Sequence, residues 1–357
     1  MSGNKISSIA VLGLGSVGEL AATMLDATGF KVTGVDTHPP ERNVPFEIRN
    51  ASAAAEDELT EVLQDQDAVL SCLPYHLNKE VARLASELGL YYFDLTEDVS
   101  TTQLISELSK KSKKLMAPQC GLAPGFIGIV GAHLAEQFDE IRSIKLRVGA
   151  LPQHPTGLLG YSFNWSPEGV VNEYLNDCEV IEDGERKWTS PMEWIETVYV
   201  NGVRLEAFTT SGGLGTMCDT YRDRIENLDY KTMRYPGHAS LMNFFFHELL
   251  MREDRTLAGK ILTNAKPPVD DDVVHIHVSA EGTQDGQLSR SEFVRSYYPM
   301  EIGGRPWRAI SWTTSSSVCA VIEMVNSGQL PDTGFLHQEK VPLDAFLETE
   351  NGQRYVV

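Results

Sequence analysis

Short apolar runs alternate with amphipathic helical patterns along the first 120 residues. Four of these runs have the length of buried strands, and they lie at residues 6–12, 30–35, 67–73 and 90–95. Apolar residues at helical spacing lie between them, at residues 17–25, 56–63 and 78–88. Strands and helices that alternate with short connections predict an α/β fold with a parallel, doubly wound sheet of the Rossmann type.

The pattern changes after about residue 140, where the apolar stretches become longer and more extended. These stretches lie at residues 144–149, 193–200, 203–210, 230–235 and 273–280. Such stretches predict a second, α+β domain built on a mixed or antiparallel sheet. A helix with a dense apolar face is expected over residues 238–251, and a last helix, rich in small residues, over residues 313–326.

A glycine-rich loop joins the first predicted strand to the first predicted helix. Residues 13–18 read GLGSVG, which fits the pattern GxGxxG, and Asp36 ends the next strand at the spacing expected for a ribose ligand. Gly13 permits a tight turn, Gly15 lets the backbone approach a pyrophosphate, and Gly18 allows the helix to pack closely on the strand. The loop therefore predicts dinucleotide binding by Gly13, Gly15, Ser16, Val17, Gly18 and Asp36.

Asp36 also favours NAD over NADP. Its carboxylate accepts hydrogen bonds from ribose hydroxyls, whereas its charge repels a 2′-phosphate. His38 and Arg42 lie close behind and soften this preference. At the carboxyl end of a later strand, where open α/β sheets bind ligands, the residues expected to border the cofactor are Leu73, Pro74 and Tyr75. An ordinary strand-ending proline turn is the alternative for this segment.

Charge and composition narrow the classes of partner. The 357 residues include 50 acidic and 30 basic side chains, a formal net charge of -20, which argues against nucleic acid and membrane surfaces as partners. The five cysteines form no CxxC pair, so no metal site or disulfide framework is expected. The first residues lack the layout of a cleavable signal, and a cytoplasmic location is expected. The uncharged run at residues 115–135 contains prolines and glycines that predict strand, loop and helix rather than a membrane span.

Four further segments carry a resemblance to a known family. They are CGLAPGF at residues 120–126, FNWSPEG at 163–169, EAFTTSGGL at 206–214 and YKTMRYPGH at 230–238. Together with the glycine-rich loop they resemble the saccharopine dehydrogenase family and, within it, the lysine 6-dehydrogenase branch. In saccharopine-forming members an aspartate usually follows CGL, whereas this chain has Ala123. That departure favours lysine over saccharopine as the substrate.

The resemblance implies three parts and a homodimer. The parts are a Rossmann domain at residues 1–120, a substrate and dimerisation domain on a mixed sheet at residues 121–312, and a C-terminal helix and tail at residues 313–357 that return to the Rossmann domain. The implied reaction removes a hydride and a proton from an amine, so the site needs a group that accepts the ammonium proton.

Asp94, Glu97 and Cys120 are the candidate catalytic residues of the first domain. Asp94 and Glu97 follow a central strand at the carboxyl edge of the sheet, where either can bind or deprotonate an amine. A helix N-cap is the alternative for both carboxylates. Cys120 matches a family cysteine that faces the nicotinamide, and a small buried apolar residue is its alternative.

The candidate substrate ligands lie in the second domain. Trp165 and Glu168 present an aromatic face and a carboxylate to a cationic amine, with a surface turn as the alternative. Arg234 and Tyr235 precede a Pro-Gly turn, and the arginine fork suits an α-carboxylate. His238 follows the turn and is expected to relay a proton near neutral pH. The alternatives are an interdomain salt bridge for Arg234 and a helix cap for His238.

The leading hypothesis is an NAD-dependent amino-acid dehydrogenase that oxidatively deaminates L-lysine, a small-molecule amino acid, without a metal. A reductase of the same superfamily that acts on saccharopine or a polyamine precursor is the second hypothesis. The third is a non-catalytic NAD-binding sensor.

Overall fold

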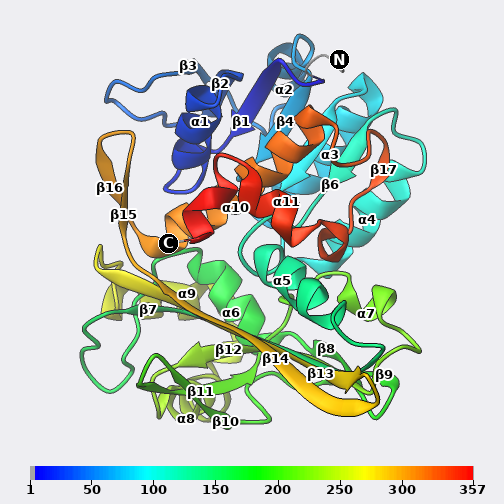
Figure 1. Ribbon diagram of the computed structural model, residues 1–357. Helices are drawn as coiled ribbons and strands as arrows, with labels where there is room; N and C mark the ends of the chain where they lie inside the picture. Colours follow the sequence, from blue (N-terminus) through cyan, green and yellow to red (C-terminus); the bar gives the residue numbers. More distant parts are fainter. Residues whose placement is uncertain (1–4, 357) are drawn as a thin grey trace. The chain divides into compact units, whose positions relative to one another are not determined.

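The computed structural model describes residues 5–356, which form two compact units (Figure 1). Unit 1 comprises the chain up to Ile129, the short segment Ile302–Arg305 and the chain from Ser311 onward. Unit 2 comprises Val130–Glu301 and Pro306–Ile310. Each unit has its own sheet and its own apolar core.

Unit 1 is built on a parallel sheet of seven strands. In spatial order these are β17 (Gly334–Phe335), β6 (Leu115–Ala117), β5 (Tyr91–Asp94), β4 (Ala68–Ser71), β1 (Ser8–Leu12), β2 (Lys31–Asp36) and β3 (Glu47–Asn50). Chain order reverses between β1 and β4, so the carboxyl ends of these two strands form the switch point at which open α/β sheets bind ligands. The predicted Rossmann sheet is confirmed.

Helices on this sheet include those that the apolar spacing predicted. The predicted helices are α1 (Gly18–Ala27), α2 (Glu56–Leu63) and α3 (Tyr75–Leu88), and α4 (Val99–Ser109) is an additional one that was not predicted. The helix α10 (Ala309–Ser327) lies in unit 1 from Ser311 onward, and there the Ser315 hydroxyl donates to the Val17 carbonyl of the glycine-rich loop at 2.9 Å. Near the end of the chain, Tyr355 stacks on Phe126, with 3.8 Å between ring centroids. The helix α10 therefore packs beside the start of α1.

Unit 2 is built on a mixed sheet. Its main path runs β10 (Glu196–Val200), β11 (Val203–Thr209), β12 (Asn227–Arg234), β7 (Glu140–Pro152), β13 (Asp272–Gln284) and β14 (Gln287–Tyr297). Strands β12 and β7 pair parallel and their neighbours pair antiparallel, which confirms the predicted mixed sheet. The hairpin of β8 (Cys178–Glu182) and β9 (Glu185–Thr189) joins the sheet through β12. The helices α6 (Pro167–Leu175), α8 (His238–Asn243) and α9 (Arg255–Ala265) contribute to the same apolar core.

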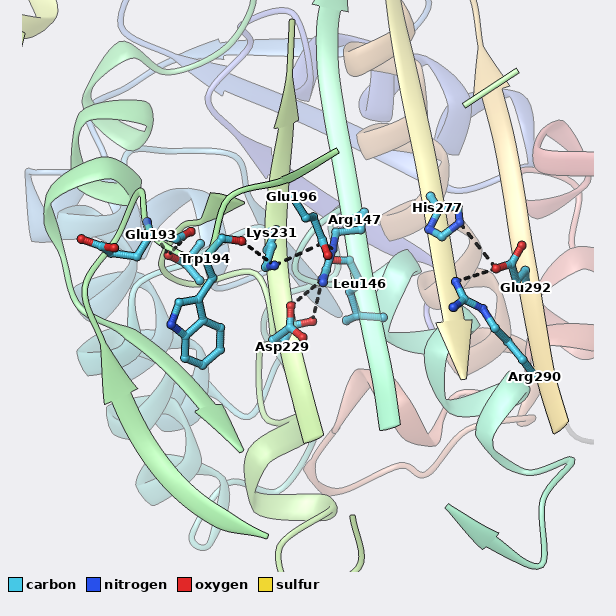
Figure 2. A network of polar contacts seen from close by, with 11 residues as sticks. Leu146, Arg147, Glu193, Trp194, Glu196, Asp229, Lys231, His277, Arg290 and Glu292 are labelled. Carbon is cyan, nitrogen blue, oxygen red and sulfur yellow. Dashed lines mark hydrogen bonds and ion pairs between the residues drawn. The ribbon is translucent and has the colours of Figure 1, made fainter. Parts of the chain in front are cut away.

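A buried network of charges ties β10 to the middle of this sheet (Figure 2). Arg147 on β7 lies opposite Lys231 on β12, and both bond Glu196 of β10, at 2.5 and 3.2 Å. The Lys231 ammonium also donates to the Trp194 carbonyl at 2.7 Å. Because Trp194 has a left-handed backbone with φ 51°, which no strand accommodates, the strand predicted from residue 193 begins only at Glu196.

The helix predicted over residues 238–251 is wrong in its second half. The α-helix α8 ends at Asn243, a π-helical turn follows at Phe244–Glu248, and Leu250 has a left-handed backbone with φ 57°. Three consecutive phenylalanines occupy this turn, and aromatic side chains lose rotamer freedom against the preceding turn of an α-helix. Within residues 5–356, no helix is long and apolar enough to cross a membrane, and the run at 115–135 forms β6, a loop and α5 (Phe126–Ala135).

Candidate functional site

The glycine-rich loop has the geometry that a dinucleotide requires. A Cβ on Gly18 would lie 1.8 Å from the Gly13 carbonyl oxygen, and one on Gly13, whose φ is +87°, would lie 2.9 Å from the Cys72 carbonyl oxygen. At Gly15, by contrast, a Cβ would meet nothing within 4 Å. Gly13 and Gly18 are thus fixed by the fold, whereas the space at Gly15 is open to a ligand.

The beginning of α1 leaves backbone donors for that ligand. Ser16 is exposed and Val17 is half-buried, and Val17, the N-cap residue, provides no side-chain cap. Uncapped N–H groups at the positive end of a helix dipole bind phosphates. These residues therefore fit a pyrophosphate, which the family fold implies.

Asp36 is held in place beside the loop. One carboxylate oxygen accepts the Leu14 N–H at 2.7 Å, and the other accepts the His38 N–H at 2.8 Å. The side chain is half-exposed at the end of β2, and a carboxylate that accepts two hydrogen bonds keeps acceptor capacity for ribose hydroxyls.

Leu73, Pro74 and Tyr75 follow β4 at the switch point. The Leu73 side chain lies 3.1 Å from the Cβ position of Gly13, so this segment borders the glycine-rich loop. Pro74 is the N-cap residue of α3, and Tyr75 begins that helix half-buried. The segment therefore forms a strand-ending turn that lies against the glycine-rich loop, and its contact with a cofactor stays a prediction.

Asp94 lies inside unit 1 rather than at its surface. Its carboxylate accepts the Tyr92 hydroxyl at 2.7 Å and the backbone N–H groups of Thr96 and Gln119 at 3.0 and 2.9 Å. Burial raises its pKa from 3.8 to about 6, although these hydrogen bonds lower it in part. Through these hydrogen bonds Asp94 ties β5 to the loop before Cys120, and its role toward a substrate amine stays a prediction.

Neither predicted carboxylate caps the next helix. Asp98 is the N-cap residue of α4, because its side chain accepts the Thr101 N–H at 2.7 Å. Glu97, half-buried between β5 and α4, therefore stays a candidate for binding an amine.

Cys120 is fully buried, and its backbone N–H donates to the Asp94 carbonyl at 2.9 Å. The thiol donates to the Ala117 carbonyl at 3.1 Å and accepts from the Gln338 amide at 3.1 Å. Burial, followed by the charge of Asp94, raises the pKa of this thiol well above its ordinary value. Cys120 is thus a neutral thiol at neutral pH and not a thiolate nucleophile.

Arg234 forms the centre of a buried cluster in unit 2. Its Nε donates to the Tyr174 hydroxyl at 2.8 Å, and its Nη1 donates to the Met233 carbonyl at 2.9 Å. The guanidinium carbon lies 4.6 Å from the centre of the Tyr161 ring, whose hydroxyl accepts from Trp165 at 3.3 Å. These hydrogen bonds join Arg234 to residues of its own unit, not to an interdomain partner.

His238 continues this cluster with a defined tautomer. Its Nδ1 lies 3.0 Å from the Leu159 carbonyl oxygen, which only accepts, so Nδ1 carries the proton. Its Nε2, 3.0 Å from the Tyr174 hydroxyl, then accepts from that hydroxyl, which in turn accepts from Arg234. Burial, and then the charge of Arg234, lowers the pKa of His238 to about 3. The expectation that His238 titrates near neutral pH is therefore wrong.

The beginning of α8 is capped by Glu206 and not by His238. Its carboxylate accepts the N–H groups of Gly237 and Ala239, at 2.8 and 2.7 Å, at the beginning of α8. Tyr235, before the turn, is half-buried and donates its hydroxyl to the Pro152 carbonyl at 2.9 Å.

The WSPEG segment, residues 165–169, lies partly in the Arg234 cluster and partly at the surface. Trp165 reaches Tyr161, but Glu168 is exposed in the first turn of α6, which agrees with its alternative as a surface turn. Further along α6, Glu173 is buried and contributes to the electrostatic environment of Arg234. Sequence reasoning missed Tyr161, Glu173 and Tyr174, because nothing in the apolar spacing distinguishes them from core residues.

No group of three or more His, Cys, Asp or Glu side chains among residues 5–356 is arranged to hold a metal ion.

Comparison with known proteins agrees with the geometry of both units. Residues 9–119 match the saccharopine dehydrogenase NADP binding domain, and residues 121–349 match the saccharopine dehydrogenase C-terminal domain. The chain belongs to the saccharopine dehydrogenase family. Its N-terminal part is accordingly a pyridine-nucleotide-binding domain.

Curated relatives are distant and longer. Mitochondrial alpha-aminoadipic semialdehyde synthase of Rattus norvegicus is 24% identical over 209 residues, which cover 53% of this chain and 22% of the rat protein. Saccharopine dehydrogenase [NADP(+), L-glutamate-forming] of Saccharomyces cerevisiae is 22% identical over 258 residues, which cover 65% of this chain and 53% of the yeast protein. The matches thus span about half or less of the length of these relatives.

Solved structures share the fold. Apo saccharopine dehydrogenase (L-Glu forming) from Saccharomyces cerevisiae has a TM-score of 0.75 at 16% identity and covers 96% of each chain. Diaminopimelate (DAP) dehydrogenase of C. glutamicum has a TM-score of 0.51 at 10% identity and covers 99% of each chain.

Proposed function

We propose that this chain is an NAD-linked amino-acid dehydrogenase of the saccharopine dehydrogenase family that oxidatively deaminates L-lysine. The observation that carries the proposal is the buried guanidinium of Arg234, which Tyr174 and the Met233 carbonyl hold at the end of β12. A fixed, charged fork in an aromatic surround suits the α-carboxylate that every amino acid carries.

The residues of unit 2 bind and orient the substrate in this proposal. Arg234 binds the α-carboxylate, and neutral His238 fixes the Tyr174 hydroxyl that orients Arg234. The rings of Tyr161 and Trp165 exclude water from the carboxylate and strengthen its attraction to the guanidinium. When bound, the nicotinamide ring supplies the hydride acceptor.

NAD as the preferred cofactor rests on Asp36. Its carboxylate ends β2 and is anchored by two backbone N–H groups, so it cannot turn away from a 2′-phosphate without losing both bonds. The matching family model is described as an NADP binding domain. We propose NAD despite that description, because the negative charge of Asp36 repels a 2′-phosphate.

A cytoplasmic location, expected from the cysteines, is part of the same proposal, and all five cysteines are free thiols.

Oxidation of saccharopine is the second candidate function, because the relatives in both comparisons carry that name or lie in its family. Ala123, in place of the aspartate of saccharopine-forming members, speaks against it. A substrate with additional carboxylates also needs additional cations, and the matching segments supply no second basic cluster.

Purified full-length chain tests the proposal with two cofactors and two substrates. Lysine and saccharopine are each supplied with NAD and with NADP, and reduced nicotinamide is followed by absorbance. We expect turnover of lysine with NAD. Turnover of saccharopine but not lysine contradicts the proposed substrate, faster turnover with NADP contradicts the proposed cofactor, and nucleotide binding without turnover of any amino acid supports a sensor.

A further inference from the structure

Glu19 lies one residue beyond the glycine-rich loop and is almost completely buried in the first turn of α1. Its side chain is 5% exposed. Three hydrogen bonds from two arginines reach its carboxylate. Arg42 donates from Nε to Oε1 at 3.0 Å and from Nη2 to Oε2, and Arg305 donates from Nη1 to Oε1 at 2.7 Å.

Arg42 lies in the segment that connects β2 to β3, where Rossmann domains distinguish NAD from NADP. This connection follows Asp36 at the carboxyl end of β2 and leads to β3, and Arg42 is its only lysine or arginine. An arginine near the end of this strand accommodates the 2′-phosphate of NADP in Rossmann domains. The Arg42 side chain remains 45% exposed, so the chain holds a cation within the adenosine region without burying it.

Glu19 occupies one of the two bidentate edges of the Arg42 guanidinium. A guanidinium recognises phosphate through the same pair of parallel N–H groups with which it grips a carboxylate. Nε and Nη2 of Arg42 form such a pair with Glu19, which holds the guanidinium at the first turn of α1 and offsets part of its charge. Arg305, whose contact with Glu19 lies within unit 1, donates to the same Oε1 atom as Arg42 Nε and helps to keep the carboxylate in position.

We infer that Glu19 is a positioning residue that withholds Arg42 from the 2′-phosphate and thereby sets the preference for NAD. Asp36 repels the phosphate, and Glu19 holds back Arg42, the arginine of the β2–β3 connection that would attract it. This inference rests on the NAD preference proposed above and adds a second determinant, outside the glycine-rich loop and Asp36.

Equilibrium titration of the full-length chain with NAD and with NADP, in the absence of any amino acid, tests this inference. Glu19→Gln keeps an acceptor of similar shape but removes the anion. We expect its affinity for NADP to rise roughly tenfold, the value of one charged hydrogen bond, while its affinity for NAD stays within about twofold. The double variant Glu19→Gln with Arg42→Met should lose this gain.

Two further variants provide the controls. Arg42→Met alone should leave NADP affinity nearly unchanged, because Arg42 is already occupied, and this variant keeps the inference testable if Glu19→Gln does not fold. Arg305→Met leaves the Arg42 fork on Glu19 and should keep the wild-type ratio of the two affinities. Thermal melting of each variant establishes that it is folded.

Three results would overturn the inference. They are an unchanged NADP-to-NAD ratio in folded Glu19→Gln, a gain that survives the loss of Arg42, and a tenfold loss of NADP affinity in Arg42→Met alone. If the wild-type chain prefers NADP, that result contradicts the proposed cofactor and not the role of Glu19. In that case, an Arg42→Met variant with unchanged NADP affinity still shows that Arg42 does not bind the 2′-phosphate. Failure of lysine oxidation affects neither outcome, because no substrate is present.

Discussion

At the residue scale, Arg234 carries the prediction for substrate binding. Arg234→Met removes the charged fork, so we expect the KM for lysine to rise by roughly 2–3 kcal/mol, or roughly 30- to 150-fold. NAD affinity should hardly change, because the glycine-rich loop and Asp36 lie in unit 1. Steady-state kinetics and nucleotide titration measure the two effects. An Arg234→Met variant that keeps its lysine KM excludes Arg234 as the anchor.

Tyr174 offers a milder version of the same test. Tyr174→Phe leaves the charge of Arg234 in place but removes its hydrogen bond at Nε, and we expect a rise in lysine KM of about tenfold. Tyr91→Phe is the matched control, since Tyr91 is equally buried in unit 1 and its hydroxyl makes only a long contact of 3.4 Å with Lys114. Equal effects of the two substitutions would mean that Tyr174 acts through stability alone.

The raised pKa of Asp94 predicts that the folded chain loses stability as the pH rises through about 6. Its folded pKa is about 6, against 3.8 for the free side chain, so the folded chain binds this proton more tightly than the unfolded chain. The resulting stabilisation is present below about pH 3.8 and is lost as the pH rises through about 6. Asp94→Asn keeps an acceptor for the two N–H groups and does not titrate. Relative to wild type, it should gain roughly 3 kcal/mol between these limits.

Urea denaturation of both proteins across this pH range measures that difference. A constant difference between Asp94→Asn and wild type contradicts the raised pKa. Loss of lysine turnover in a folded Asp94→Asn variant, with nucleotide affinity intact, would restore Asp94 as a catalytic group.

At the scale of elements, we expect the glycines of the turn between β1 and α1 to have different roles, since Gly18 is needed for folding and Gly15 for nucleotide binding. We expect Gly15→Ala to melt like wild type, since its Cβ meets nothing within 4 Å, but to bind NAD about tenfold more weakly or worse, because the Cβ occupies the space of the pyrophosphate. Gly18→Ala should instead lose about 1–3 kcal/mol or more of stability, because its Cβ would lie 1.8 Å from the Gly13 carbonyl oxygen. If Gly15→Ala retains full NAD affinity, the loop does not hold the pyrophosphate.

Secondary structure was predicted best where the apolar spacing was continuous. The helices α2 and α3 and the strands β1, β2, β4 and β5 follow from apolar spacing and β-branched runs. In contrast, α4 and β14 were not predicted, because threonine and serine dominate the start of α4 and exposed polar residues fill much of β14. The π-helical turn after α8 was not predicted for a different reason, since its composition is that of an ordinary apolar helix face.

At the scale of the whole molecule, we predict a homodimer formed through unit 2. The strands β10 and β14 lie at the two ends of its main sheet path, and open edges are natural pairing surfaces. Leu288, on β14, is a large apolar side chain that is 66% exposed. Light scattering should give twice the mass of the chain at micromolar concentration, and Leu288→Lys should weaken the dimer. Leu158→Lys, at an exposed leucine outside the sheet strands, is the matched control. A wild-type monomer would contradict the prediction.

The sequence by itself determined the Rossmann sheet, its glycine-rich loop and the placing of Asp36, because these depend on local turn geometry and on the periodicity of apolar residues. It also pointed to Arg234, through a motif. Only the tertiary structure decided what surrounds these residues. Tyr174 and His238 lie 60 and 64 positions from their partners along the chain, and Glu19 meets an arginine 286 positions away. The protonation states of Asp94, Cys120 and His238 likewise depend on burial, and burial is a property of the packed chain, not of any segment of it.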